Sequence, residues 1–190
     1  MIKNPLVVTL GDPSGIGAEV FLKAVFESNL RNQLELITVV ASKQIIKNVS
    51  KILKYSEANS LKVEEVKLDY DYKLGVPNIK NASYVIECLN RAADIAYKEK
   101  ISLVTGPINK RIISNEISSF SGHTEYLKEN FNCKDVLMLL SNNSLKVGVA
   151  TTHVALKNVS NMITKDLIIS KCRLLDQGLK KLYGIENPKI

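Results

Sequence analysis

A glycine-rich turn near the start of the chain is the first segment whose residue types could bind a ligand. The segment Gly11-Asp12-Pro13-Ser14-Gly15-Ile16-Gly17 lies between an apolar run and a helical pattern. Glycines there let a phosphate or carboxylate approach the backbone N–H groups at a helix N-terminus. The spacing matches neither GxGxxG nor the GK[ST] of a P-loop. The segment is therefore either a ligand-binding loop, in which Asp12 caps the helix, touches a ligand or carries charge toward a metal, or only a tight turn.

A second turn of similar character is Thr105-Gly106-Pro107-Ile108-Asn109-Lys110. Glycine and proline end a short apolar run here, and a helical pattern follows. Lys110 could reach a phosphate or lower the pKa of a nearby hydroxyl. Taken alone, the turn favours the simpler interpretation of a strand-to-helix connection with an exposed lysine.

The two histidines of the chain both lie at the ends of predicted elements. His123 enters a helical pattern within the segment 121–125, and His153 follows an apolar run within the segment 150–154. Two histidines placed in this way beside Thr and Gly favour a shared site. A metal requires three or four ligands, and the wide spacing of the two histidines is no metal-binding signature by itself.

Alternating strand and helix patterns must position these residues. Apolar runs predict buried strands at 5–10, 34–41, 61–68 and 101–105. Apolar residues at helical spacing predict helices at 16–28, behind Ser42 as a cap, at 81–98 with Asn81 as a cap, at 109–116, at 124–130, and from Thr164 to Gly184. Two more strands, at 135–140 and 145–150, are joined by the turn 141–144 and predict an antiparallel hairpin.

This order of elements predicts an α/β protein with three layers, α/β/α, and a mostly parallel mixed sheet. Ligands bind beyond the carboxyl ends of the strands in such sheets. Both turns follow strands, so they belong to that edge of the predicted sheet.

The composition excludes several classes of protein. The chain has 190 residues, of which 45% are hydrophobic and 24% charged, with 9 glycines and 5 prolines. Disordered, collagen-like and disulfide-scaffold proteins do not have this composition. No apolar run approaches the roughly 18 residues of a membrane span, and the N-terminus is too short in apolar residues for a signal peptide. We therefore expect a cytoplasmic protein that does not contact a membrane.

The net charge of +7 favours small anionic ligands. There is no basic run and no tryptophan, so a nucleic-acid partner is not expected. The three cysteines, Cys88, Cys133 and Cys172, form no CxxC pair, and we expect them to be reduced and mostly buried.

Four sequence blocks together resemble one enzyme family. The blocks GDPSGIG, VTGPINK, FSGHTEYL and VGVATTHVALKNVS occur in the order and at about the spacing of the 4-hydroxythreonine-4-phosphate dehydrogenase family of pyridoxal phosphate biosynthesis, and the resemblance runs from Leu6 to Ile190. It implies a homodimer whose chains fold into two α/β/α lobes with the active site in the cleft, similar to isocitrate and isopropylmalate dehydrogenases. It also accounts for the missing GxGxxG, because this family holds its dinucleotide without a Rossmann fingerprint.

The resemblance implies an oxidoreductase that oxidises the C3 hydroxyl of 4-phosphooxy-L-threonine with NAD or NADP. The resulting β-keto acid then loses CO₂ to give 3-amino-2-oxopropyl phosphate. It also implies metal binding: a divalent ion (zinc, magnesium or cobalt) between the partners of the dimer, where chelation of the substrate hydroxyl would lower its pKa before hydride transfer.

The site residues implied by the resemblance can be placed one by one. The family's GHT matches the segment 122–124, so His123 and Thr124 are expected to bind substrate. The family's ATTH matches the segment 150–153, so His153 is expected to be a metal ligand. Lys110 and Asp12 match residues near the family's site, but no residue is assigned a catalytic step.

The chain departs from the family pattern because it ends at Ile190. The family's other two metal histidines, in the blocks NPHAGE and YHDQG, come later, as do the Lys, Asn and Arg that complete substrate binding. We expect residues 1–190 to be the N-terminal portion of a two-lobed dehydrogenase without its C-terminal remainder, and one histidine to hold a metal weakly. The chain is then a fragment, half of a split protein, or a truncated inactive relative.

Two alternative functions remain open. The first is a truncated, non-catalytic module that binds phosphorylated ligands. The second is a related dehydrogenase that acts on another four-carbon acid phosphate.

Overall fold

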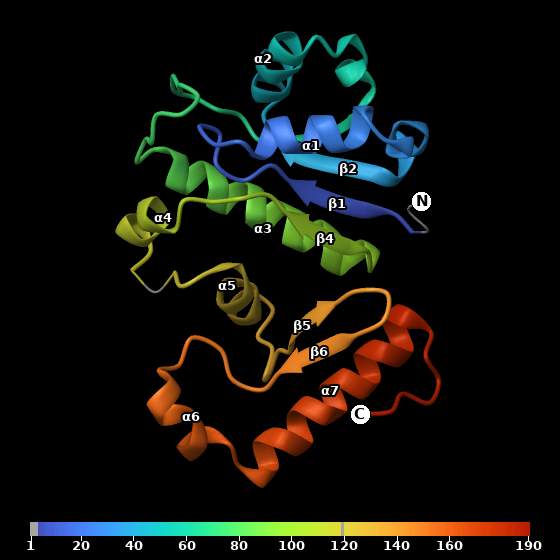
Figure 1. The fold of residues 1–190 in the computed structure, drawn as a ribbon. Helices are drawn as coiled ribbons and strands as arrows, with labels where there is room; N and C mark the ends of the chain where they lie inside the picture. Colours follow the sequence, from blue (N-terminus) through green and yellow to red (C-terminus); the bar gives the residue numbers. More distant parts are fainter. Residues whose placement is uncertain (1–3, 119) are drawn as a thin grey trace. The chain divides into compact units, whose positions relative to one another are not determined.

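The computed structural model describes residues 4–118 and 120–190, and the chain divides into two compact units, Met1–Tyr126 and Leu127–Ile190 (Figure 1). None of the helices in the described part of the chain has the length and apolar character needed to cross a bilayer.

The first unit is built on a four-stranded parallel sheet. Its strands are β1 (Leu6–Thr9), β2 (Ile37–Ala41), β3 (Lys62–Glu65) and β4 (Ser102–Thr105), in the order β3-β2-β1-β4. The chain moves from β1 through β2 to β3 and then returns to β4 on the other side of β1. The direction of strand order therefore reverses between β1 and β4, which is where ligands bind in open α/β sheets.

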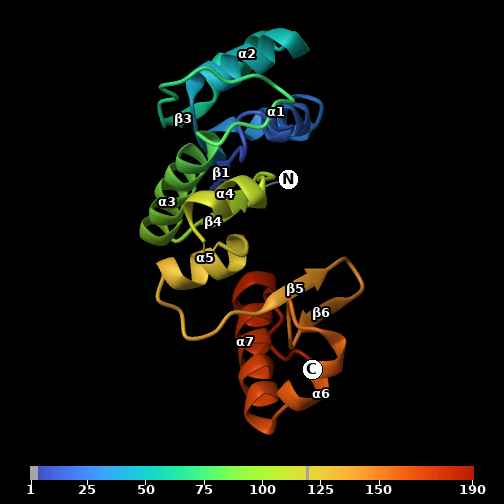
Figure 2. The same cartoon turned by 90° about the vertical axis from the view of Figure 1, so that its left-hand side faces the viewer.

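Helices cover both faces of this sheet (Figures 1 and 2). The connecting helices are α1 (Gly17–Phe26), α2 (Lys43–Leu53) and α3 (Asn81–Glu99). Right-handed crossovers place α1 and α2 on one face and α3 on the other, because the return to β4 runs in the opposite direction. The predicted α/β class with a parallel sheet and helices on both faces is confirmed.

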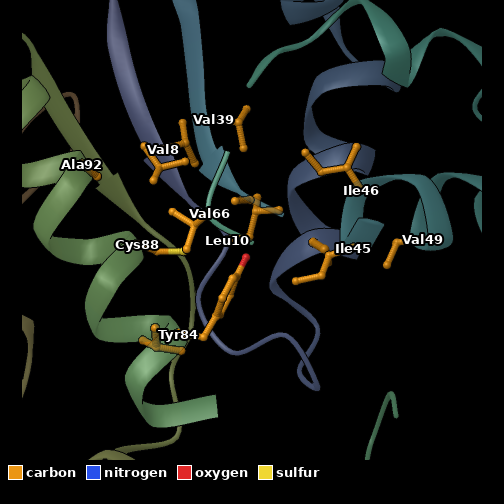
Figure 3. Packing of buried hydrophobic residues seen from close by; sticks show 14 of the residues in the cluster. Val8, Leu10, Val39, Ile45, Ile46, Val49, Val66, Tyr84, Cys88 and Ala92 are labelled. Carbon is orange, nitrogen blue, oxygen red and sulfur yellow. The ribbon is translucent and has the colours of Figure 1, made fainter. Parts of the chain in front are cut away.

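The core of the first unit lies between the sheet and these helices. Val7, Val39 and Val40 on the central strands are fully buried, as expected for strands covered on both faces. Figure 3 shows Tyr84 and Cys88 of α3 pointing toward Leu10 and Val66. The Tyr84 hydroxyl also accepts a 2.8 Å hydrogen bond from the Ser42 backbone N–H, which ties α3 to the end of β2.

Two predictions, one for a strand of this unit and one for the cysteines of the chain, need correction. The strand predicted at 34–41 begins only at Ile37, because the parallel pairing starts with Ile37 opposite Leu6, and the preceding residues form the 3₁₀ helix η1 (Asn29–Leu36). The cysteines are not mostly buried, since Cys133 and Cys172 are exposed. Only Cys88 is buried, and burial raises the pKa of its thiol to about 12, so it is unreactive.

The second unit contains a hairpin and two helices. Strands β5 (Met138–Ser141) and β6 (Lys146–Val149) pair antiparallel, as predicted, but the structure places them in a two-stranded sheet of their own. Helix α7 (Lys165–Tyr183) begins at the Thr164 cap and ends at Gly184, also as predicted. The short helix α6 (Leu156–Met162) was not predicted.

The second unit buries little apolar surface within itself. Leu179 is its one buried residue, whereas Leu140, Leu156 and Leu182 are at least 60% exposed. A two-stranded hairpin is marginally stable without further packing. Its polar contacts therefore contribute a large share of its local order.

One such contact is centred on Asp135, just before β5. Its carboxylate accepts hydrogen bonds from Lys171 Nζ at 2.5 Å and from Ser170 Oγ at 2.8 Å, both on α7. Lys171 also donates to the Val136 carbonyl at 2.7 Å. These hydrogen bonds, chiefly the one from Lys171, hold the pKa of Asp135 below its ordinary value.

This pKa shift predicts a loss of order in the second unit at acid pH. Because the folded-state pKa of Asp135 is the lower one, its contribution is present above the unfolded-state pKa and is lost as the pH falls through the folded-state value. Asp135→Asn should remove about 1 kcal/mol of local stability near neutral pH and flatten the acid dependence. Amide hydrogen exchange of α7 measures this. Asp176→Asn, which breaks an exposed pair with Lys180, is the matched control, and an equal effect of both variants would contradict the prediction.

Candidate functional site

The two turns singled out in the sequence lie side by side at the carboxyl ends of β1 and β4. The Asp12 N–H donates to the Pro107 carbonyl at 3.0 Å, and the Gly106 N–H donates to the Thr9 carbonyl at 2.8 Å. The pairing of β1 with β4 places Thr9 opposite Thr105, so both turns leave the sheet at the same level. The structure thus brings the two motifs together at the point where strand order reverses.

Three glycines allow this close packing of backbone on backbone. A Cβ at Gly17 would lie 1.8 Å from the Leu10 carbonyl oxygen, and one at Gly106 would lie 2.4 Å from it. Gly11 has a φ of +78°, and its Cβ would lie 2.1 Å from the Pro107 carbonyl oxygen. These three glycines are required by the packing of the two turns. The remaining glycine of the first turn, Gly15, lines the pocket beside the two turns.

A buried polar network fixes the first turn. Asn81 Nδ2 donates to Asp12 Oδ1 at 2.6 Å and to Ser14 Oγ at 2.9 Å. The Ser14 N–H donates to the same Asp12 oxygen at 2.8 Å. Asn81 Oδ1 accepts from the Tyr70 hydroxyl at 3.0 Å, and burial raises the pKa of Tyr70, which keeps this donor protonated.

This network corrects the role predicted for Asn81. The residue does not cap α3: Lys80 occupies the cap position without a side-chain hydrogen bond, and Asn81 is the first helical residue. Its amide is committed to Asp12 and Ser14, which lie more than 65 residues earlier in the chain. The sequence could not reveal this contact, because an asparagine at the start of a helix is equally suited to cap the helix and to donate hydrogen bonds to distant residues.

A pocket of about 440 Å³ opens beside the two turns. It is lined by Asp12, Ser14, Gly15, Ile16, Gly75, Pro77, Pro107, Ile108, Asn109 and Lys110. Isoleucine and proline side chains supply apolar walls, and Asp12, Asn109 and Lys110 supply polar groups. A concave, largely apolar site with a few polar groups is typical of small-molecule binding.

Helix α4 (Lys110–Glu116) begins at this pocket. Asn109 caps it by accepting a hydrogen bond from the Ile112 N–H at 3.3 Å. Ile112 and Ile113 of the same helix are buried, which fixes the direction in which α4 leaves the turn. Lys110, the first helical residue, is therefore held at the pocket edge by local structure on both sides.

His123 and Thr124 open helix α5 (His123–Asn130) and are half-buried. The Tyr126 hydroxyl in the same turn donates to Asn90 Oδ1 on α3 at 2.9 Å, and the Tyr126 ring packs on Phe120 with centroids 5.5 Å apart. These contacts hold the start of α5 in the first unit. Burial lowers the pKa of His123, and the charge of Lys110 lowers it further, so its imidazole is neutral near pH 7.

His153 lies in the second unit, after β6, where it is exposed and has a φ of +56°. The site that His123 and His153 were predicted to share stays a prediction. In the described part of the chain, no group of three or more His, Cys, Asp or Glu side chains is arranged to hold a metal ion. The described donor set therefore does not fit a complete zinc site, which needs at least three protein ligands.

The chain is similar to one family of known proteins over most of its length. The family model "Pyridoxal phosphate biosynthetic protein PdxA" matches residues 15–190. The 4-hydroxythreonine-4-phosphate dehydrogenase of Pseudoalteromonas translucida is 33% identical over 197 residues, and the enzyme of the same name from a Sulfurihydrogenibium species is 35% identical over 198. Each alignment covers 97% of this chain but only 60% or 61% of the relative.

A solved structure supports the fold. The crystal structure of 4-hydroxythreonine-4-phosphate dehydrogenase from Klebsiella pneumoniae superposes with a TM-score of 0.85 at 22% identity, covering 98% of this chain and 62% of that one. The chain thus spans about three fifths of the length of the proteins it matches. On the family-model match and the curated relatives together, the chain belongs to the family of the pyridoxal phosphate biosynthetic protein PdxA.

Proposed function

We propose that this chain is the N-terminal portion of an NAD(P)-dependent 4-hydroxythreonine-4-phosphate dehydrogenase. The complete enzyme transfers a hydride from C3 of 4-phosphooxy-L-threonine to NAD(P)⁺ and releases the hydroxyl proton. The β-keto acid then loses its carboxylate as CO₂ to give 3-amino-2-oxopropyl phosphate. Family membership across residues 15–190 carries this proposal, and the family's named dehydrogenases support it.

Within this reaction we assign His123 and Thr124 to substrate binding. Both lie at the start of α5, anchored to α3 through Tyr126. A half-buried neutral imidazole can accept a hydrogen bond from a substrate hydroxyl or donate one to a substrate oxygen. Fixing the substrate in this way supplies orientation, which accounts for a large part of the barrier reduction in reactions between two bound molecules.

The metal-ligand role of His153 is likewise a proposal. A divalent cation bound at this position would supply Lewis-acid chemistry to the substrate hydroxyl. The described residues of the chain form no group of three candidate ligands around it. The same proposal includes a homodimer, a cytoplasmic location and either NAD or NADP as the cofactor.

The proposal predicts activity in a completed protein. Residues 1–190 would be joined to the C-terminal portion of a curated relative, and NAD(P)H formation from 4-phosphooxy-L-threonine would be followed by absorbance with a divalent metal present. His123→Ala should lower kcat/KM by about a hundredfold, since substrate orientation is lost. Asn115→Ala, an exposed residue of α4, is the control for substitution itself.

If the folded, completed protein forms no NAD(P)H from this substrate, the substrate assignment fails. Erythronate 4-phosphate and threonate 4-phosphate would then test the related four-carbon acid phosphates. Activity with one of these would place the chain with a dehydrogenase of different specificity.

For the 190-residue chain by itself, we propose ligand binding without turnover. The observation that favours this second function is the lack of a three-ligand metal group among the described residues. Calorimetry with 4-phosphooxy-L-threonine should then show binding that is lost in His123→Ala, while NAD(P)H is not produced. Turnover by the 190-residue chain would contradict it.

A further inference from the structure

Lys110 lies at the contact between the pocket and the loop that precedes His123. It lines the pocket at the start of α4. The end of its side chain also lies near Gly122: a Cβ built there would lie 3.2 Å from Lys110 Nζ and 3.6 Å from its Cε. Gly122 is buried, and a side chain at this position would crowd the ammonium group. The same side chain therefore borders the pocket and the residues proposed to bind substrate.

The lining of the pocket offers an anionic ligand one cation, Lys110. The one anion of that lining, Asp12, already accepts hydrogen bonds on one oxygen from Ser14 and Asn81. Glu125 Oε2 of α5 also faces Gly122, 3.3 Å from the same Cβ position. An anion in the pocket would therefore meet Lys110 as its cationic partner.

We propose that Lys110 binds the anionic group of the ligand held by His123 and Thr124. The group is a phosphate or a carboxylate, for which a lysine ammonium is a flexible point-charge partner. The proposal rests on the proposed function only in taking His123 and Thr124 as ligand-binding residues. It gives Lys110, which is exposed after its turn, a contact with the ligand.

The two histidines make this testable in the 190-residue chain. Inorganic phosphate would be added while the imidazole Cε1–H signals are followed by NMR, with sodium chloride at matched ionic strength as the reference. Phosphate should shift the His123 signal saturably and raise the pKa of His123, because an anion offsets the charge of Lys110. Acetate in a parallel titration distinguishes a carboxylate from a phosphate as the preferred group.

Variants then separate binding from folding. Lys110→Met should weaken phosphate binding by about tenfold or more, since a charge-assisted contact is lost, and should raise the pKa of His123 without phosphate. Lys110→Arg keeps the charge and should restore both properties. Lys43→Met, which removes an exposed lysine on α2, should change neither.

Several outcomes would overturn the proposal. One is a folded Lys110→Met that binds phosphate as tightly as the wild type, and another is a wild-type chain that responds to phosphate and acetate no more than to chloride. In the completed protein, an unchanged KM in Lys110→Met would refute the proposed contact of Lys110 with the ligand and leave the dehydrogenase assignment intact. Conversely, Lys110-dependent phosphate binding in a protein that never forms NAD(P)H would refute the dehydrogenase and retain this inference.

Discussion

Replacing Gly17 by alanine is expected to destabilise the first unit by about 3 kcal/mol or more. The added Cβ would lie 1.8 Å from the Leu10 carbonyl oxygen, 3.0 Å from its carbon and 3.2 Å from Pro107 Cδ. Two of these atoms are backbone, so no side-chain rotation relieves the contact. The gain of about 1 kcal/mol in helix propensity is too small to compensate.

Tyrosine fluorescence during urea unfolding measures this effect selectively. The chain has no tryptophan, and six of its seven tyrosines lie in the first unit. Gly178→Ala is the matched control: this glycine is also helical, in α7, and nothing lies within 4 Å of its Cβ position. It should be neutral or stabilising by up to about 1 kcal/mol. Equal midpoints for Gly17→Ala and the wild type would refute the packing of the two turns.

Replacing Asn81 by alanine is expected to cost about 2–3 kcal/mol of unfolding free energy. Asn81 is 1% exposed, and its amide makes three hydrogen bonds, to Asp12, Ser14 and Tyr70. Removing it leaves a partly buried carboxylate and two hydroxyls each without one hydrogen-bond partner. The loop that lines the pocket should lose order as well, because the Ser14 backbone carbonyl accepts a hydrogen bond from the Gly75 N–H at 2.8 Å.

Asn48→Ala is the control for this second prediction. The Asn48 amide donates to the Tyr72 hydroxyl at 3.2 Å in an exposed position, and its loss should change stability by less than about 0.5 kcal/mol. Urea unfolding gives both free energies, and amide exchange at Ser14 and Gly75 reports on the loop. If the two asparagine variants lose the same small amount, the buried network does not hold the turn.

The sequence by itself determined most of the elements and their class, although it missed α6 and η1. Continuous apolar runs identified the four parallel strands of the first unit, and Ser42, Thr164 and Gly184 marked helix ends that the structure confirms. These features are local, since a strand or a cap depends on residues within a few positions of one another. The four sequence blocks also identified the family, which the family model confirms.

Tertiary structure decided which of these residues meet. Gly17 and Gly106 are both required because of Leu10, and Asn81 serves Asp12 and Ser14 instead of capping its helix. Lys110 is exposed after a turn, as the sequence indicated, but only the fold shows that its ammonium group lies near Gly122, the residue before His123. Such contacts join residues far apart in the chain, and side-chain type and spacing carry no information about them until the strand order brings the two turns to one edge of the sheet.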